Sequence, residues 1–491
     1  MQCVPSKQGF PLLSFPPEIL LEIAKRLGWE EVLSIRQTCR LLFEITNARE
    51  VWVSLFWRLS RENIVPPVLE CSLSSYTAAE LELVVMRRVS SEKRLRAGEK
   101  ARERVYLQDQ IPMDDEQYLL DGGKWLLTMC NEINKWGRVY VYNLDGEPSG
   151  QCIIDLGIST LEDADMYMSC DRDLNNKDVL AYTVCLSPRF SFPPEPFMSV
   201  DGDWPGEGIH IYRLIAKGRG ENATLEAKKV KYLRYPQFIE PVYDITLRGD
   251  YFVQCLEQGE EDDDDPNVLS FEVWNWVLSD TLFHFKARID VDVTLSDSDI
   301  SDCDLVLLPS GKAVTFTHCI SVYDLSNIRP TPIDRYDEPW ALQPYWMSAN
   351  FSFSSISAYS DPWRDSQVSR LSVVLDGIVF GLTVPHDKSK DPWYQQISDV
   401  NVSKFTIADI GMNKLLLYEE KDGRTILTTV GFLWDNDTDL FPKDHLPSAV
   451  GSPSRPFSTY ICDLVPVFDE SSNRLVVFSK GSCILLDFAY K

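Results

Sequence analysis

The sequence predicts a small all-α part followed by a larger all-β part. Between residues 12 and 105 apolar residues recur at helical spacing. From about residue 111 short apolar runs alternate with Gly, Asp, Asn and Pro, as strands and turns do. The chain has 491 residues, more than a single hydrophobic core usually spans, so we expect more than one domain.

The first predicted helix lies in the stretch PPEILLEIAKRLG, residues 16–28. Its prolines and Glu18 suit a helix start, and Gly28 suits a helix end. Apolar side chains lie on two faces of this helix, with Ile19, Leu20, Ile23 and Leu27 on one and Leu21 on the other. A segment this short with two apolar faces can form a core with one face and leave the other for a partner.

Further helices are expected over residues 30–37, 38–47 and 50–59. The last of these carries apolar residues at i, i+3, i+4 and i+7, namely Trp52, Leu55, Phe56 and Leu59. A long helix, or two, is predicted over residues 77–105. Eight Lys and Arg lie between residues 87 and 104 against three Glu, a pattern more typical of a solvated helix face than of a binding patch.

The all-β part repeats one kind of strand. The phrases are VYVYNLDG (139–146), IHIYRL (209–214), FEVWNWVLSD (271–280), ISVYDLSN (320–327) and CILLDFAY (483–490). The aligned aromatic positions Tyr142, Tyr212, Trp274 and Tyr323 are 70, 62 and 49 residues apart. Two weaker units fit between the last two phrases, LDGIVFGLTV (375–384) and RTILTTVGF (424–432).

Repeats of antiparallel strands at this spacing, with loop insertions, are typical of β-propeller blades. We therefore predict a β-propeller with seven blades, six or eight being the alternatives, over residues 106–491. A β-sandwich would not need so many copies of one strand phrase. The stretch RVYLQDQI (104–111) is expected to supply the strand that closes the ring with the last blade.

Charge separates the same two parts of the chain. Residues 1–110 hold 16 Lys and Arg and 14 Asp and Glu. The whole chain holds 48 Lys and Arg and 74 Asp and Glu, so the remaining residues hold 32 basic and 60 acidic side chains. A strongly negative propeller repels nucleic acid and anionic membranes and favours a basic partner. No apolar run is long enough to cross a membrane and no secretion signal is evident, so we expect a cytoplasmic or nuclear protein.

The residues from Phe15 to Phe56 resemble the F-box motif. The matching positions are Phe15, Pro16, Glu18, Ile19, Leu20, Ile23, Leu27, Leu33, Arg36, Thr38, Cys39, Arg40, Phe43, Trp52 and Leu55. Phe15 stands where Leu is common and Phe43 where Trp is usual, and both keep apolar bulk. The segment SLSSYTAAELELVVMRRV and the strand end VWNWVLSD are similar to fungal F-box proteins with propeller-like carboxy-terminal halves, a looser likeness.

The resemblance implies a substrate receptor of an SCF-type ubiquitin ligase with no catalytic residues and no cofactor. It divides the chain into an F-box (12–60), a helical linker (61–105) and a target-recognition domain (106–491). The F-box would bind a Skp-family adaptor and, through it, a cullin and a RING subunit. The expected adaptor-binding residues are Phe15, Pro16, Ile19, Leu20, Ile23, Leu27, Leu33, Arg36, Cys39, Phe43 and Trp52. The target protein is unknown, and the acidic propeller favours a basic one. The alternatives are an adaptor-binding scaffold outside a ligase and a propeller enzyme.

Other patterns point to structure rather than chemistry. The five histidines lie far apart and the twelve cysteines form no metal-ligand spacing, so no metal site is expected. The stretch GRGENA (218–223) formally fits the dinucleotide-binding pattern G-x-G-x-x-A but is predicted to be a hairpin loop. The acidic run EQGEEDDDDP (257–266) is predicted to be a loop between two strands of one blade, with docking of a basic segment or binding of divalent cations as the alternatives. Six tryptophans lie in or near Pro- and Asp-rich connections: Trp204, Trp340, Trp346, Trp363, Trp393 and Trp434. They are either recognition anchors or fillers between blades.

Overall fold

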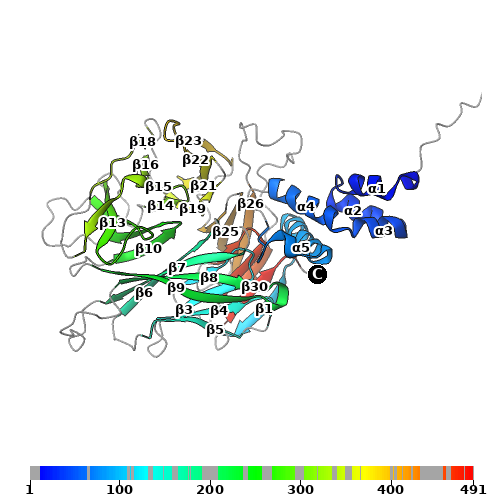
Figure 1. The fold of residues 1–491 in the computed structure, drawn as a ribbon, viewed down its shortest axis with the longest axis horizontal. Helices are drawn as coiled ribbons and strands as arrows, with labels where there is room; N and C mark the ends of the chain where they lie inside the picture. Colours follow the sequence, from blue (N-terminus) through cyan, green and yellow to red (C-terminus); the bar gives the residue numbers. More distant parts are fainter. Residues whose placement is uncertain are drawn as a thin grey trace, which may run out of the picture.

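The computed structural model joins five helices to a ring of β-sheets (Figure 1). It describes residues 12–62, 67–107, 111, 116–130, 137–146, 149–157, 164–174, 176, 179–190, 208–235, 242–256, 268–292, 304–317, 319–333, 340–348, 356–364, 367–398, 402, 406–411, 413–421, 424–431, 457–460, 466–479 and 482–489. The acidic run at 257–266 lies outside these residues, as do Trp204 and Trp434.

The helices follow the predicted order. They are α1 (Pro17–Ala24), α2 (Trp29–Arg36), α3 (Arg40–Thr46), α4 (Arg49–Glu62) and α5 (Ala78–Ala97). We call α1 to α4 the helical module. The predicted long helix is shorter than expected, because Gly98 adopts a left-handed conformation (φ 64°) that ends α5. The residues that follow form strand β1 (Arg102–Leu107) instead.

Within the described residues the strands form seven antiparallel sheets, so the predicted propeller with seven blades is confirmed. Blade 1 holds β2 (Gln117–Leu119), β3 (Trp125–Cys130), β4 (Arg138–Asn143) and β5 (Gln151–Asp155). Blade 2 holds β6 (Ala164–Arg172), β7 (Ala181–Phe190), β8 (Gly208–Lys217) and β9 (Thr224–Arg234). Blade 3 holds β10 (Val242–Arg248), β11 (Tyr251–Leu256), β12 (Val268–Asn275), β13 (Phe283–Asp292) and the added edge strand β17 (Arg329–Pro332).

The remaining blades repeat this plan. Blade 4 holds β14 (Asp304–Leu308), β15 (Lys312–Phe316), β16 (Ile320–Asp324) and β18 (Trp346–Met347). Blade 5 holds β19 (Ile356–Tyr359), β20 (Trp363–Arg364), β21 (Val368–Leu375), β22 (Ile378–Pro385) and β23 (Trp393–Gln396). Blade 6 holds β24 (Thr406–Ile410), β25 (Lys414–Lys421), β26 (Arg424–Gly431) and β27 (Phe457–Tyr460). Blade 7 holds β28 (Val467–Asp469), β29 (Arg474–Ser479), β30 (Ser482–Asp487) and β1.

The repeated phrases all fall on the third strand of a blade, from β4 in blade 1 to β30 in blade 7. The ring is closed by β1, which pairs with β30 from Arg102↔Asp487 to Leu107↔Ser482, as predicted for this region of the sequence. Closure joins the beginning and the end of the propeller sequence in one blade, in which β1 is the outermost strand.

The first strand of each blade is the innermost, and neighbouring first strands pack side by side, as β6 and β10 do. These strands run in the same direction, so their carboxyl ends meet at one face of the ring. The residues that α5 contacts lie at this face: Asp145 after β4, Lys414 at the start of β25 and Ala489 after β30. We call it the helix-side face.

Candidate functional site: an apolar surface on the helical module

The helical module keeps large apolar side chains in solvent although it has a core of its own. Phe15, Ile19 and Phe43 are between 40% and 48% exposed. Leu12, Leu13 and Leu41 are exposed as well. We call these six residues the outer apolar surface. They belong to the entry into α1, to α1 itself and to α3, which lie at the end of the molecule away from the propeller (Figure 1).

The inner faces of the same helices build the core. Leu20 and Ala24 of α1 and Trp52 of α4 are buried. They pack with Val32, Leu42, Ile45, Val51, Leu55, Phe56, Tyr76, Leu81 and Val85. Since Leu81 and Val85 belong to α5, the module and the linker helix share one hydrophobic core rather than two.

The predicted adaptor-binding residues divide between these two environments. Phe15, Pro16, Ile19 and Phe43 are exposed, whereas Ile23, Leu27, Leu33, Arg36 and Cys39 are half-buried. Leu20 and Trp52 are buried, so in this structure they support the module from inside. Leu12, Leu13 and Leu41 were not predicted, although the letters PLLSF next to a helix start could have indicated the first two.

Arg36 has an internal partner. Its guanidinium donates to both carboxylate oxygens of Glu82 in α5, at 2.5 and 3.0 Å. The same group lies 5.8 Å from the ring centre of Phe43 and 5.2 Å from that of Trp52. Arg36 therefore links α2 to the linker helix and supports the exposed ring of Phe43 from behind.

The chain between the module and α5 is attached to blades 1 and 2. Glu70 accepts hydrogen bonds from Lys124 Nζ of blade 1, at 2.6 Å, and from the backbone N–H of Gly220 in the turn between β8 and β9, at 3.0 Å. The Tyr76 hydroxyl also donates to Glu70, at 3.1 Å. Burial, together with the adjacent Glu70 carboxylate, raises the pKa of Tyr76. The turn at Gly220 is the hairpin predicted for GRGENA.

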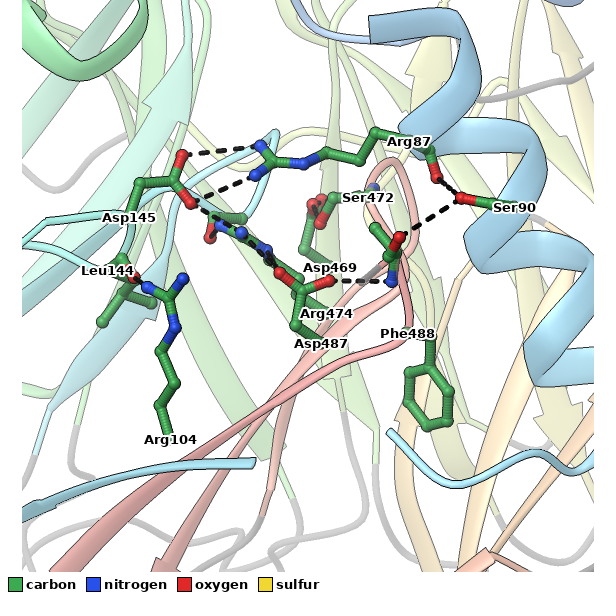
Figure 2. A network of polar contacts seen from close by, with 12 residues as sticks. Arg87, Ser90, Arg104, Leu144, Asp145, Asp469, Ser472, Arg474, Asp487 and Phe488 are labelled. Atoms are coloured by element: carbon green, nitrogen blue, oxygen red, sulfur yellow. Dashed lines mark hydrogen bonds and ion pairs between the residues drawn. The ribbon is translucent and has the colours of Figure 1, made fainter. Parts of the chain in front are cut away.

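A buried polar network fixes α5 to the seam between blades 7 and 1 (Figure 2). Arg87 of α5 and Arg474 of β29 both donate to Asp145, and Arg474 also donates to Asp487 at 2.6 and 3.0 Å. Burial alone would raise the pKa of Asp145, but the two guanidinium groups hold it below its ordinary value. Ser90 of α5 completes the contact by donating to the carbonyl of Ala489.

One turn further along α5, Glu92 makes a second attachment, to blades 6 and 7. It accepts from Lys414 Nζ at 2.6 Å and from the Asn473 side chain at 3.2 Å. Although burial opposes ionisation, Lys414 and Arg88 hold the pKa of Glu92 well below its usual range. The prediction that the basic stretch is a solvated face is therefore wrong for Arg87, Arg88 and Arg94, which the structure places against the propeller or within buried ion pairs.

Carboxylates also gather where the innermost strands end at the helix-side face. Arg248 of β10 donates to Asp171 of blade 2 and to Asp361 of blade 5, and Arg172 donates to Asp121 of blade 1. Asp409 of β24 accepts from the backbone N–H of Phe468 at 3.2 Å. Arg248 thus connects blade 3 with its neighbour, blade 2, and with blade 5, which lies beyond blade 4. Among the described residues no three His, Cys, Asp or Glu side chains are placed to hold a metal ion.

The predicted tryptophans also divide between two environments. Trp340 and Trp393 are exposed, and Trp340 lies under the guanidinium of Arg329 at 4.0 Å from its ring centre. Trp346 and Trp363 are half-buried. No described helix is both long and apolar enough to cross a membrane.

No protein-family profile matches the sequence, and comparison with curated proteins gives no match either. Solved structures similar in shape include a protein from Lactobacillus plantarum, at 9% identity over 72% of this chain and 88% of that chain, with a TM-score of 0.35. A post-proline cleaving enzyme from Rickettsia typhi has 9% identity over 80% and 57% of the two chains and a TM-score of 0.25. The β-propeller domain of Nup133 from Vanderwaltozyma polyspora has 10% identity over 75% and 93%, with a TM-score of 0.21. These TM-scores are too low to support a fold assignment, so the propeller assignment rests on the strand topology of the chain itself.

Proposed function

We propose that this chain is an F-box-type substrate receptor of an SCF-type ubiquitin ligase. The helical module would bind a Skp-family adaptor, and the propeller would hold the target protein near the ligase's conjugating enzyme. The receptor itself catalyses nothing in this proposal; it raises the local concentration of target lysines.

The observation that carries the proposal is the exposure of Phe15, Ile19 and Phe43 on a folded module. These residues match the F-box pattern in the sequence, and the core of the module leaves them uncovered. Burying a large apolar side chain contributes roughly 1.5–3 kcal/mol. Six exposed apolar residues can therefore support a stable interface after the costs of association are subtracted.

The attachments of α5 support the same role. A receptor must hold the adaptor and the target at a fixed relative orientation if it is to direct ubiquitin to particular lysines. Arg36–Glu82 links the module to α5, and Arg87 and Glu92 link α5 to three blades. The module is thus attached to the propeller by partly buried ion pairs, which resist bending more strongly than a solvated linker.

Affinity purification tests the proposal. The wild-type chain is compared with a Phe15→Ala/Pro16→Ala variant and with Leu83→Ala, a control at an exposed apolar residue of α5 outside the outer apolar surface. The Skp-family adaptor should accompany the wild type and the control and be lost from the double variant. Equal recovery from all three would remove the F-box assignment.

Two other functions, an adaptor-binding scaffold and a propeller enzyme, remain as alternatives. If the adaptor is recovered without a cullin, the protein is an adaptor-binding scaffold outside a ligase. A propeller enzyme would use the carboxylates at the ring's helix-side end. Arg248 pairs with both Asp171 and Asp361 there, which favours a structural role for these two groups over acid–base catalysis.

A further inference from the structure

We propose that the turn between β12 and β13 is a docking surface for a polypeptide segment that combines apolar side chains with Lys or Arg. Four large apolar residues in this turn, Val277, Leu278, Leu282 and Phe283, are between 42% and 67% exposed. We call them the blade 3 patch. Single exposed apolar residues are ordinary, but four within one short turn form the kind of surface that marks an interaction site.

The turn is held in one conformation before any partner binds. The Asn275 side chain accepts from the backbone N–H of Leu278, and the Asp280 carboxylate accepts from those of Leu282 and Phe283. Lys231 of the neighbouring blade donates to the carbonyls of Trp276, Val277 and Ser279. A partner therefore meets an ordered surface, and binding does not cost the entropy of fixing the turn.

The charges around the patch select the partner. The exposed carboxylate of Asp280 lies within the turn, and exposed Asp250 lies next to it because the backbone N–H of Trp276 donates to the Asp250 carbonyl at 3.0 Å. Carboxylates offset two of the cations of this region, Arg248 with Asp171 and Asp361, and Lys286 with Glu272 at 2.6 Å. Lys231 donates to backbone carbonyls and keeps its charge, so carboxylates outnumber cations among these groups and the two aspartates. The remaining field is negative and attracts a basic segment.

The position of the patch fits a receptor. It lies at the helix-side face on blade 3, whose strand β13 is at the left of Figure 1, while the helices are at the right beside blades 6, 7 and 1. The role of the bound segment as a ligase target rests on the proposed function above. The binding surface itself does not, because it shares no residue with the outer apolar surface.

Two synthetic peptides of equal length serve as probes. They share the same Leu positions, and one carries Lys and the other Glu at the remaining positions. Binding of each labelled peptide to the full chain is followed by fluorescence anisotropy. The chain is compared with Leu278→Ser/Leu282→Ser and with the control Val105→Ser/Leu107→Ser, whose residues on the outer strand β1 are 58% and 56% exposed.

The Lys peptide should bind the wild type and the control equally, and the patch variant at least about tenfold more weakly. Asp250→Lys, which reverses a charge and keeps the backbone carbonyl that bonds to Trp276, should weaken the same peptide by a similar factor. Binding of the Lys peptide that is unchanged in both variants, or a Glu peptide bound as tightly as the Lys peptide, would overturn the proposal.

Light scattering on the same proteins tests whether a second copy of the chain occupies the blade 3 patch instead. If the wild type forms a dimer that Leu278→Ser/Leu282→Ser converts to a monomer, the patch binds a second copy of the chain and the proposal is wrong. Phe15→Ala/Pro16→Ala should bind the Lys peptide normally whatever it does to the adaptor. A failure of the adaptor proposal and a failure of this one therefore give different results.

Discussion

Arg474 is buried and contacts three parts of the chain that lie far apart in sequence. Its guanidinium donates to Asp487 of the last blade, to Asp145 of the first blade and to the carbonyl of Gly123, at 2.8 Å (Figure 2). Asp145 in turn accepts from Arg87 of α5. One side chain thus connects ring closure with docking of the linker helix.

Replacing Arg474 with Ala should destabilise the protein by about 3–5 kcal/mol, because Asp487 and Asp145 would stay buried with fewer cationic partners. Urea unfolding followed by fluorescence measures the change. The control is Arg138→Ala, which breaks an exposed pair with Asp155 and should leave the midpoint unchanged. Similar midpoints for both variants would show that the network does not stabilise the seam.

Asp409 is placed where ionisation is unfavourable. Burial, with Asp361 and Glu470 nearby, raises its pKa to about 7. A carboxyl whose pKa is raised in the folded state binds its proton more tightly there than in the unfolded chain. Its contribution to stability is therefore fully present below the ordinary pKa of an Asp carboxyl, about 4, and is lost progressively as the pH rises from there through 7.

Asp409→Asn should therefore stabilise the protein relative to wild type more at pH 8 than at pH 5. The difference between the two pH values should be about 1–2 kcal/mol, since the group is partly accessible to water. Denaturant unfolding of both proteins at the two pH values provides the measurement. A stability gap that is the same at both would contradict the raised pKa.

At the scale of elements, α5 belongs to the helical module and to the propeller at once. It begins with a capping box, in which Thr77 Oγ1 accepts from the Glu80 N–H and Glu80 accepts from the Thr77 N–H at 2.7 Å. Its middle carries Arg87 and Glu92, and it ends at Gly98. Both ends of the helix are therefore defined by local sequence, while its position is defined by contacts with three blades.

Thr77→Ala should cost about 1 kcal/mol, because the Glu80 backbone N–H loses its acceptor and the Glu80 carboxylate loses the Thr77 hydroxyl. Thr77→Ser keeps the accepting oxygen and should remain within a few tenths of a kcal/mol of wild type. Thermal unfolding monitored by circular dichroism compares the three proteins. Equal destabilisation by Ala and Ser would show that the methyl group matters and not the cap.

At the scale of the molecule, the helices and the propeller form one packed unit. Arg87→Ala/Glu92→Ala removes two ion-pair attachments of α5 to the ring and leaves the more exposed one between Glu80 and Arg219. Hydrogen exchange in residues 78–97 should then become at least about tenfold faster, because that helix loses its buried partners. Lys93→Ala is the control, because it removes contacts of α5 with Glu30 and the Trp29 ring in the helical module and none with the ring of blades. Unchanged exchange in the double variant would mean that apolar packing alone holds the helix.

The sequence predicted the parts of this architecture that repeat or that are local. All seven repeated phrases fall on third strands. In every blade this strand is buried, rich in β-branched and aromatic residues and bounded by turns, so its sequence pattern recurs. The Arg474 network could not be predicted, since its members are separated by hundreds of residues and no local pattern marks them. The same limit applies to β17, which follows β16 of blade 4 but pairs with β13 of blade 3.

The candidate surface was predicted only in part, for a related reason. Helical spacing placed Ile19 and Leu20 on one stripe, yet Ile19 is exposed and Leu20 is buried. Periodicity identifies apolar faces but does not say which face meets the module's own core. The linker boundary predicted at residue 105 was also wrong, because it divides β1, the strand that closes the ring.

The most direct test of the account is the affinity of the purified chain for a purified Skp-family adaptor, measured by calorimetry. The wild type is compared with Ile19→Ala/Phe43→Ala, which shortens two exposed side chains without opening the core. Binding should be at least about tenfold weaker in the variant, with an unchanged unfolding midpoint, since each side chain loses apolar contact area with the partner. An adaptor that does not bind the wild type, or that binds both proteins equally, would contradict the proposed role of the outer apolar surface.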